Sequence, residues 1–187
     1  MAAQTPQYQL KSTVVMVGMM GSGKTAIGRA LAAALDVPFV DSDAAIEEAA
    51  ALTIAEIFER DGEPFFRKRE TEVLRRLLSG PPGIVSTGGG AFLAAQNRDA
   101  IAQMGVAVWL DADLATLWER VRHKDTRPLL RTDDPKATLT NIFEQRTPIY
   151  ALAGVRVPID PLASIADTTE RVLSALAQRD DILEVRR

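Results

Sequence analysis

The chain has 187 residues, 47% hydrophobic and 25% charged, which is the size and composition of one ordinary globular domain. Its 22 Lys and Arg residues and 25 Asp and Glu residues give a net charge of −3, which argues against a protein that binds nucleic acid through a basic surface. With no Cys and one His, the chain cannot form disulfides, a catalytic thiolate or a cluster of His metal ligands. The N-terminus has no signal-peptide core, and no apolar run reaches the roughly 20 residues of a membrane span. We expect a single domain over residues 1–187 that acts as a cytoplasmic monomer, with no nucleic-acid or membrane partner.

Short β-branched segments alternate along the chain with segments of helical periodicity. The predicted strands are residues 12–18, 37–40, 84–87, 106–110 and 155–157. The predicted helices are residues 24–35, 44–50, 64–78, 113–121 and 164–177, with a further one through 143–150. Asp113 is predicted to cap its helix, the Ser164-x-x-Asp167 pattern to begin the last helix, and Thr53 and Glu56 to form a capping box. This alternation favours right-handed βαβ units and an α/β fold with a parallel sheet covered on both faces.

Three segments do not follow this alternation. Residues 124–135 are polar, contain two prolines and lie between two predicted helices, so they are predicted to form a mobile lid. Residues 1–11 and 180–187 are predicted to be frayed tails.

The segment from Gly18 to Thr25 reads G-M-M-G-S-G-K-T, which matches the P-loop pattern G-x-x-x-x-G-K-[ST]. A strand is predicted before it and a helix after it, which is the context in which backbone N–H groups cradle phosphate oxygens. Lys24 would reach the β- and γ-phosphates, and the Thr25 hydroxyl could ligate Mg²⁺. The sequence therefore predicts a nucleotide site at this turn.

The P-loop alone does not identify the reaction. No Asn-Lys-x-Asp motif is present, which argues against a guanine-specific GTPase, and the third strand ends in Ser86-Thr87 where many ATPases carry an acidic residue. Asp41, at the end of the second strand, is the predicted replacement. Asp41 and Asp43 could divide the work between a metal ion and an acceptor hydroxyl. The alternative is that they only cap the helix over residues 44–50.

Three basic positions could serve an anionic substrate, although each has a simpler interpretation. Arg67 and Glu70 share a helix face, and an arginine fork suits a carboxylate, but the spacing alone favours a solvated helix face. Arg127 in the predicted lid and Arg146 on the following helix could neutralise charge or form surface ion pairs. The glycines at 88–90 permit close approach of a ligand to the backbone, or they form only a flexible turn.

Taken together, these motifs resemble those of the shikimate kinases. The resemblance rests on G-M-M-G-S-G-K-T, D-S-D, F-F-R-x-x-E, S-T-G-G-G, R-P-L-L and E-x-R-x-P-x-Y, which occur in family order between residues 18 and 150. It implies a three-layer P-loop kinase fold, with a five-stranded parallel sheet in the order 2-3-1-4-5 and a mobile lid. It also implies transfer of the γ-phosphoryl group of ATP to the 3-hydroxyl of shikimate, giving shikimate 3-phosphate in aromatic amino-acid biosynthesis.

The resemblance also assigns roles to individual residues. Lys24, Asp43 and Arg127 would be catalytic, and Thr25 and Asp41 would hold Mg²⁺. Nucleotide contacts would come from Gly21, Ser22, Gly23, Lys24, Thr25, Ala26, Arg120, Arg127 and Ser164. Shikimate would be bound in a region over about residues 41–70 and beyond, by Asp43, Arg67, Gly88, Gly89, Gly90 and Arg146.

Two alternatives remain open at this point. A gluconate kinase would keep the P-loop and lid but need not combine Arg67 and Arg146 with the glycines at 88–90. A P-loop protein that binds nucleotide without catalysis would be expected to have lost some of Lys24, Thr25, Asp43 and Arg127, all of which are present.

Overall fold

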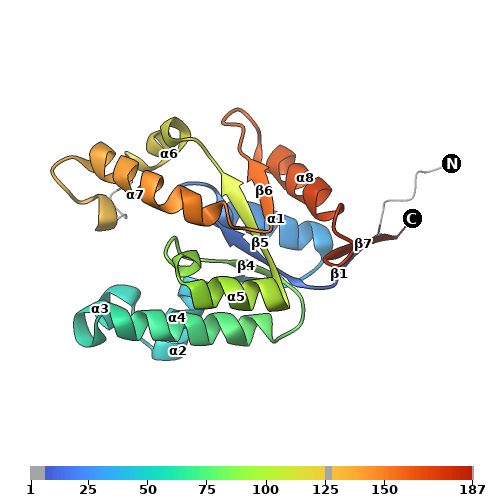
Figure 1. Cartoon of the computed structure of the whole chain (residues 1–187), viewed down its shortest axis with the longest axis horizontal. Coiled ribbons are helices and arrows are strands. Elements are labelled where there is room, and N and C mark those ends of the chain that lie inside the picture. The colour runs from blue at the N-terminus through green and yellow to red at the C-terminus, as the bar shows by residue number, and fades with distance from the viewer. Residues whose placement is uncertain (1–6, 125–127, 187) are drawn as a thin grey trace.

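A computed structural model describes residues 7–124 and 128–186, and its centre is a five-stranded parallel sheet (Figure 1). The strands are β2 (Thr13–Val17), β3 (Phe39–Asp41), β4 (Ile84–Ser86), β5 (Gly105–Asp111) and β6 (Val155–Pro158). They lie in the order β3-β4-β2-β5-β6, and all neighbouring pairs are parallel. The predicted fold class and the predicted strand order are therefore confirmed.

The central strand, β2, is buried on both faces. All five of its residues are fully covered, so the run of β-branched residues reflects burial on two sides rather than alternation. Val14 and Met16 belong to the apolar cluster under α1 (Lys24–Leu35) and α8 (Ile165–Leu176). Val15 and Val17 belong to the cluster on the opposite face.

Helices cover both faces of this sheet (Figure 1). Opposite α1 and α8 lie α4 (Glu63–Leu78), α5 (Ala95–Met104), α6 (Leu114–Val121) and α7 (Pro135–Tyr150), which supply apolar residues to the second cluster. The predicted N-terminal caps are confirmed: Asp113 accepts a hydrogen bond from Thr116 N at 2.7 Å, and Ser164 forms a capping box with Asp167.

Two short helices extend the layer formed by α4. They are α2 (Ser42–Ala50) and α3 (Ile54–Asp61), and α3 begins with the predicted capping box of Thr53 and Glu56. Their apolar side chains meet α4 in a small separate cluster of Ile46, Ile57, Phe66 and Val73. The predicted acceptor-side region therefore has a core of its own beside the sheet.

The prediction of frayed tails is wrong for the described residues. β1 (Gln7–Leu10) and β7 (Leu183–Arg186) form a two-stranded antiparallel ribbon. Leu10 and Leu183 are buried in the cluster under α1 and α8. These two leucines are partners across the ribbon, and their burial holds down segments whose overall polarity suggested disorder.

Three further elements were absent from the sequence-based prediction. They are α5, the 3-10 turn η1 (Ala91–Leu93) and the 3-10 turn η2 (Pro128–Leu130). The last turn lies inside the predicted lid, where Leu130 is buried as part of the apolar cluster to which α6 and α7 contribute. The mobility of residues 124–135 stays a prediction. Among the described residues, no helix combines the length and the apolar character that crossing a membrane requires.

Candidate functional site

The loop between β2 and α1 has the conformation of an anion cradle. Gly21 and Gly23 have φ angles of 81° and 99°, in the left-handed region that glycine adopts most readily. Gly23 has no side chain to cap α1, so the first N–H groups of this helix face the loop, where they favour an anion. Lys24 Nζ donates hydrogen bonds to Gly18 O at 2.8 Å and Met19 O at 3.0 Å, which places its ammonium group over the same loop.

A cavity of about 590 Å³ adjoins this loop at the carboxyl ends of the strands. It brings together most of the residues predicted to bind nucleotide and metal, and two of the three glycines at 88–90. The predicted site residues on its wall are Gly21, Ser22, Gly23, Lys24, Thr25, Ala26, Asp41, Asp43, Gly88, Gly89, Arg120 and Ser164.

Two of the predicted nucleotide contacts reach the cavity from distant helices. Arg120, on α6, donates a hydrogen bond to Gly21 O at 3.0 Å and so lies across the P-loop. Ser164 lies at the start of α8, where its hydroxyl bonds the carboxylate of Asp167 at 2.7 Å. Ser164 therefore has a capping role in addition to its place on the cavity wall.

The two aspartates after β3 have different environments. Asp41 Oδ1 accepts hydrogen bonds from Asp43 N at 2.9 Å and Ala44 N at 3.2 Å, so Asp41 caps α2. The Asp43 carboxylate takes no part in that cap. Burial, together with the negative charges of Asp41 and Glu70, raises the pKa of Asp43 to about 6, while Lys24 opposes the shift. Asp43 can therefore take up a proton near neutral pH.

Three consecutive glycines after β4, Gly88–Gly90, each lie against a charged side chain. A Cβ added at Gly88 would lie 2.8 Å from Asp43 Oδ2, and one at Gly89 would lie 3.0 Å from Arg146 Nη1. At Gly90 the nearest atom would be Arg67 Nη2, at 2.6 Å. The loop therefore collects one carboxylate and two guanidinium groups because none of its residues has a side chain.

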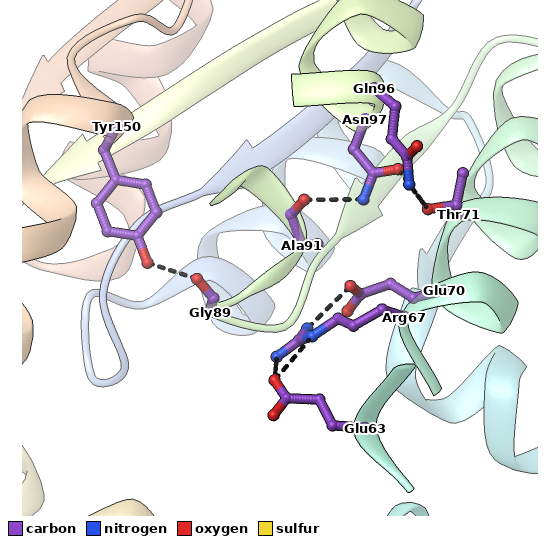
Figure 2. A network of polar contacts seen from close by, with 9 residues as sticks. All are labelled: Glu63, Arg67, Glu70, Thr71, Gly89, Ala91, Gln96, Asn97 and Tyr150. Atoms are coloured by element: carbon purple, nitrogen blue, oxygen red, sulfur yellow. Dashed lines mark hydrogen bonds and ion pairs between the residues drawn. The ribbon is translucent and has the colours of Figure 1, made fainter. Parts of the chain in front are cut away.

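Arg67 is held by carboxylates of its own helix (Figure 2). Its Nη1 donates to Glu70 Oε1 at 2.9 Å, and its Nε lies 3.4 Å from Glu63 Oε1. Glu70 is buried, and burial raises its pKa while the Arg67 guanidinium opposes the shift. The prediction that Arg67 and Glu70 share a helix face is confirmed, but Glu70 lies in the interior and not on a solvated surface.

Several polar residues of the site were not identified from the sequence. Ser86 and Thr87 line the cavity, and Ser86 Oγ lies 3.4 Å from Thr25 Oγ1. Their position at the carboxyl end of a predicted strand, where ligands bind in α/β sheets, was the signal that could have identified them. Tyr150 donates a hydrogen bond to Gly89 O in the glycine loop, and Asn97 donates one to Ala91 O just after it. These residues are distant in the sequence, so only the folded structure brings them together. The predicted catalytic Arg127 lies outside the described residues.

Comparisons with known proteins agree on one family. The family model described as shikimate kinase matches residues 20–177. The chain is 62% identical to the shikimate kinase of Ruegeria pomeroyi over 94% of this chain and 90% of that protein. It is 59% identical to the shikimate kinase of Cereibacter sphaeroides, over 94% and 88% of the two chains. A solved shikimate kinase from Acinetobacter baumannii, in complex with shikimate, superposes with a TM-score of 0.83 at 35% identity, covering 89% of this chain and 93% of that one.

Proposed function

Since the chain belongs to the shikimate kinase family, we propose that it transfers the γ-phosphoryl group of ATP to the 3-hydroxyl of shikimate. The products are shikimate 3-phosphate and ADP, and the reaction belongs to aromatic amino-acid biosynthesis. The observation that carries this proposal is that a phosphate-binding loop and an acceptor-binding carboxylate lie on the wall of the same cavity. The phosphate cradle and the Asp43 carboxylate line one cavity. The side chains of Arg67 and Arg146 lie against the same glycine loop that Asp43 touches.

The proposed phosphoryl transfer depends on position and charge more than on covalent help from the protein. The P-loop and Lys24 hold the phosphates, and Asp43 holds the acceptor and takes its 3-hydroxyl proton. The hydroxyl oxygen then bonds to the γ-phosphorus as the bond from that phosphorus to the β–γ bridging oxygen breaks, and ADP leaves. The raised pKa of Asp43 suits a group that accepts this proton near neutral pH.

The same cavity offers oxygen donors for Mg²⁺. Hydroxyls of Thr25 and Ser86 lie close together at 3.4 Å, and Asp41 lines the cavity with them. Hydroxyl and carboxylate oxygens suit Mg²⁺, which takes its other ligands from phosphate and water. We assign Thr25 and Asp41 to the ion, which neutralises phosphate charge when it is bound.

The function is tested by release of ADP, coupled to oxidation of a nicotinamide cofactor. We expect release with ATP, Mg²⁺ and shikimate, and slow release with quinate or gluconate as the acceptor. Faster release with gluconate would favour a different small-metabolite kinase. An absence of shikimate-dependent release would contradict the proposal.

Arg67 and Arg146 are proposed to bind the carboxylate of shikimate. A charge-assisted hydrogen bond contributes about 1.5–3 kcal/mol, so Arg67→Ala and Arg146→Ala should each raise the KM for shikimate about tenfold or more. The KM for ATP should change little. Arg67→Ala also leaves buried Glu70 without its partner, so Arg67→Lys is the control that keeps the charge. Unchanged KM values for shikimate in both Ala variants would contradict this assignment.

Arg127 is proposed to act from the lid on the phosphoryl group in transfer. Because its contact would be strongest in the transition state, Arg127→Ala should lower kcat far more than it weakens shikimate binding. Steady-state kinetics and calorimetric titration with shikimate measure the two effects separately. Hydrogen exchange over residues 124–135 should slow when nucleotide and shikimate are added. Wild-type kcat in the variant, or exchange that ligands leave unchanged, would count against the assignment.

A further inference from the structure

Two arginines lie over the glycine loop, and each is followed one helical turn later by a residue with a hydroxyl group. One hydroxyl bonds the loop directly, and the other is connected through a second side chain to the residue after the loop. Arg146 and Tyr150 are four residues apart on α7, and Arg67 and Thr71 are four residues apart on α4. Residues with this spacing share one helix face, so the hydroxyl and the guanidinium group face the same neighbour. The two helices therefore approach the loop in the same way from different directions.

The connection from α7 is direct (Figure 2). Tyr150 Oη donates a hydrogen bond to Gly89 O at 2.6 Å. The Tyr150 side chain is fully buried, and its ring lies against Trp109 of β5 with 6.5 Å between the ring centres. A ring fixed in the core thus sets the position of the Gly89 carbonyl, whose residue lies against Arg146.

The connection from α4 runs through Asn97 of α5, whose bond to Ala91 is drawn in Figure 2. Thr71 Oγ1 donates to Asn97 Oδ1 at 2.8 Å, and Asn97 Nδ2 donates to Ala91 O at 2.9 Å. Thr71 Oγ1 also accepts a hydrogen bond from Gln96 Nε2 at 3.3 Å. Asn97 is 1% exposed, so both ends of its amide are used in a place that water does not reach. Ala91 follows Gly90, the glycine that lies against Arg67.

We propose that Tyr150 and the Thr71–Asn97 pair are positioning residues that set the spacing of the two arginines around the glycine loop. This inference rests on the proposed function, because the arginines are taken to bind the carboxylate of shikimate. Three glycines in sequence have no side chains to anchor them by packing, and glycine backbone has unusual freedom. The hydrogen bonds on either side of the loop limit that freedom. Without them a smaller fraction of molecules has the binding conformation, and the apparent affinity for shikimate falls by that fraction.

The connection from α7 is tested by Tyr150→Phe, which removes the hydroxyl and keeps the ring against Trp109. We expect the KM for shikimate to rise about fivefold, since the half-buried Gly89 carbonyl loses the hydroxyl that donates to it, with the KM for ATP unchanged. The matched control is Thr140→Val. Thr140 Oγ1 also donates to a backbone carbonyl on α7, that of Lys136 at 2.8 Å, but away from the loop. This control should keep both wild-type KM values.

The connection from α4 is tested by Thr71→Val, which keeps the shape of the side chain and removes the donor to Asn97. We expect the KM for shikimate to rise about threefold because the effect acts through Asn97. Its control is Ser79→Ala, which removes a hydroxyl that bonds Arg75 O at the far end of the same helix. Thermal unfolding of all four variants reports whether each one is folded at the assay temperature.

The discriminating measurement uses a shikimate analogue in which the carboxylate is reduced to an alcohol. If the hydroxyls act through the arginines, Tyr150→Phe and Thr71→Val should impair shikimate while leaving the KM for the analogue at its wild-type value. Equal impairment of both acceptors, a parallel rise in the KM for ATP, or wild-type KM values for shikimate would each overturn the inference. A wild-type protein without shikimate-dependent ADP release would overturn the proposed function, and this inference with it.

Discussion

The Asp43→Asn variant should lose turnover by at least about a hundredfold, because an amide cannot take the proton of the acceptor hydroxyl. Nucleotide affinity should stay near the wild-type value, since Asp43 faces the glycine loop while the P-loop holds the phosphates. In the wild-type enzyme, kcat/KM for shikimate should fall as the pH drops below about 6, where Asp43 becomes protonated. ADP release measured between pH 5 and 8 checks the turnover and its pH dependence, and calorimetric titration with ADP checks the nucleotide affinity.

The same substitution should make the folded protein more stable at pH 7. The pKa of Asp43 rises from 3.8 to about 6 on folding, so the ionised carboxylate destabilises the native state by up to about 3 kcal/mol. This cost is fully present above pH 6 and disappears as the pH falls from about 6 towards 4. Asn carries no charge, so the gain in the free energy of unfolding should be large at pH 7 and small at pH 4.

The control for Asp43 is Asp99→Asn, an exposed aspartate of α5. It should change neither turnover nor the pH dependence of stability. Near-normal turnover of Asp43→Asn would show that the acceptor site is wrongly assigned. A variant that is less stable than the wild type at pH 7 would contradict the environment described for this carboxylate.

Lys24→Ala should also reduce turnover by at least about a hundredfold, because a preorganised positive charge beside the transferring phosphate is lost. Nucleotide affinity should fall as well, in contrast to Asp43→Asn. The hydrogen bonds from Lys24 Nζ to Gly18 O and Met19 O would also be removed, so the P-loop would lose two bonds across its turn. Calorimetric titration with ADP separates the loss of binding from the loss of turnover.

Lys68→Ala serves as the control for Lys24, because Lys68 is an exposed lysine of α4. It carries the same change in charge away from the cavity and should retain both activity and ADP binding. Wild-type ADP affinity in Lys24→Ala would argue against the phosphate cradle assigned to this loop.

Much of the fold could be predicted because its signals are local. The P-loop, the capping residues Thr53, Asp113 and Ser164, and the Arg67–Glu70 pair depend on residues within a few positions of one another. The parallel sheet followed from buried β-branched segments that alternate with helices. The separate roles of Asp41 and Asp43 could only be posed as alternatives, since burial decides which carboxylate has the raised pKa.

The features that the sequence did not reveal depend on distant parts of the chain. α5 has no side-chain cap at Ala94 and buries only Asn97, Ala100 and Ile101, so its periodicity is weak. The bond between Tyr150 and Gly89 joins residues 61 positions apart. A pattern of residue types does not specify such a pairing until the sheet has brought α7 over the glycine loop.

The β1–β7 ribbon has a consequence for how this chain is made. Gln7 pairs with Arg186 and Leu10 pairs with Leu183, so the ribbon joins segments from nearly opposite ends of the described sequence. During translation β1 leaves the ribosome early and has no partner until residues 183–186 follow it. The parallel sheet does not depend on that partner, because its last strand, β6, ends at Pro158. The ribbon is therefore the last sheet whose residues become available, and it covers the apolar side chains of Leu10 and Leu183 only once synthesis has passed β7.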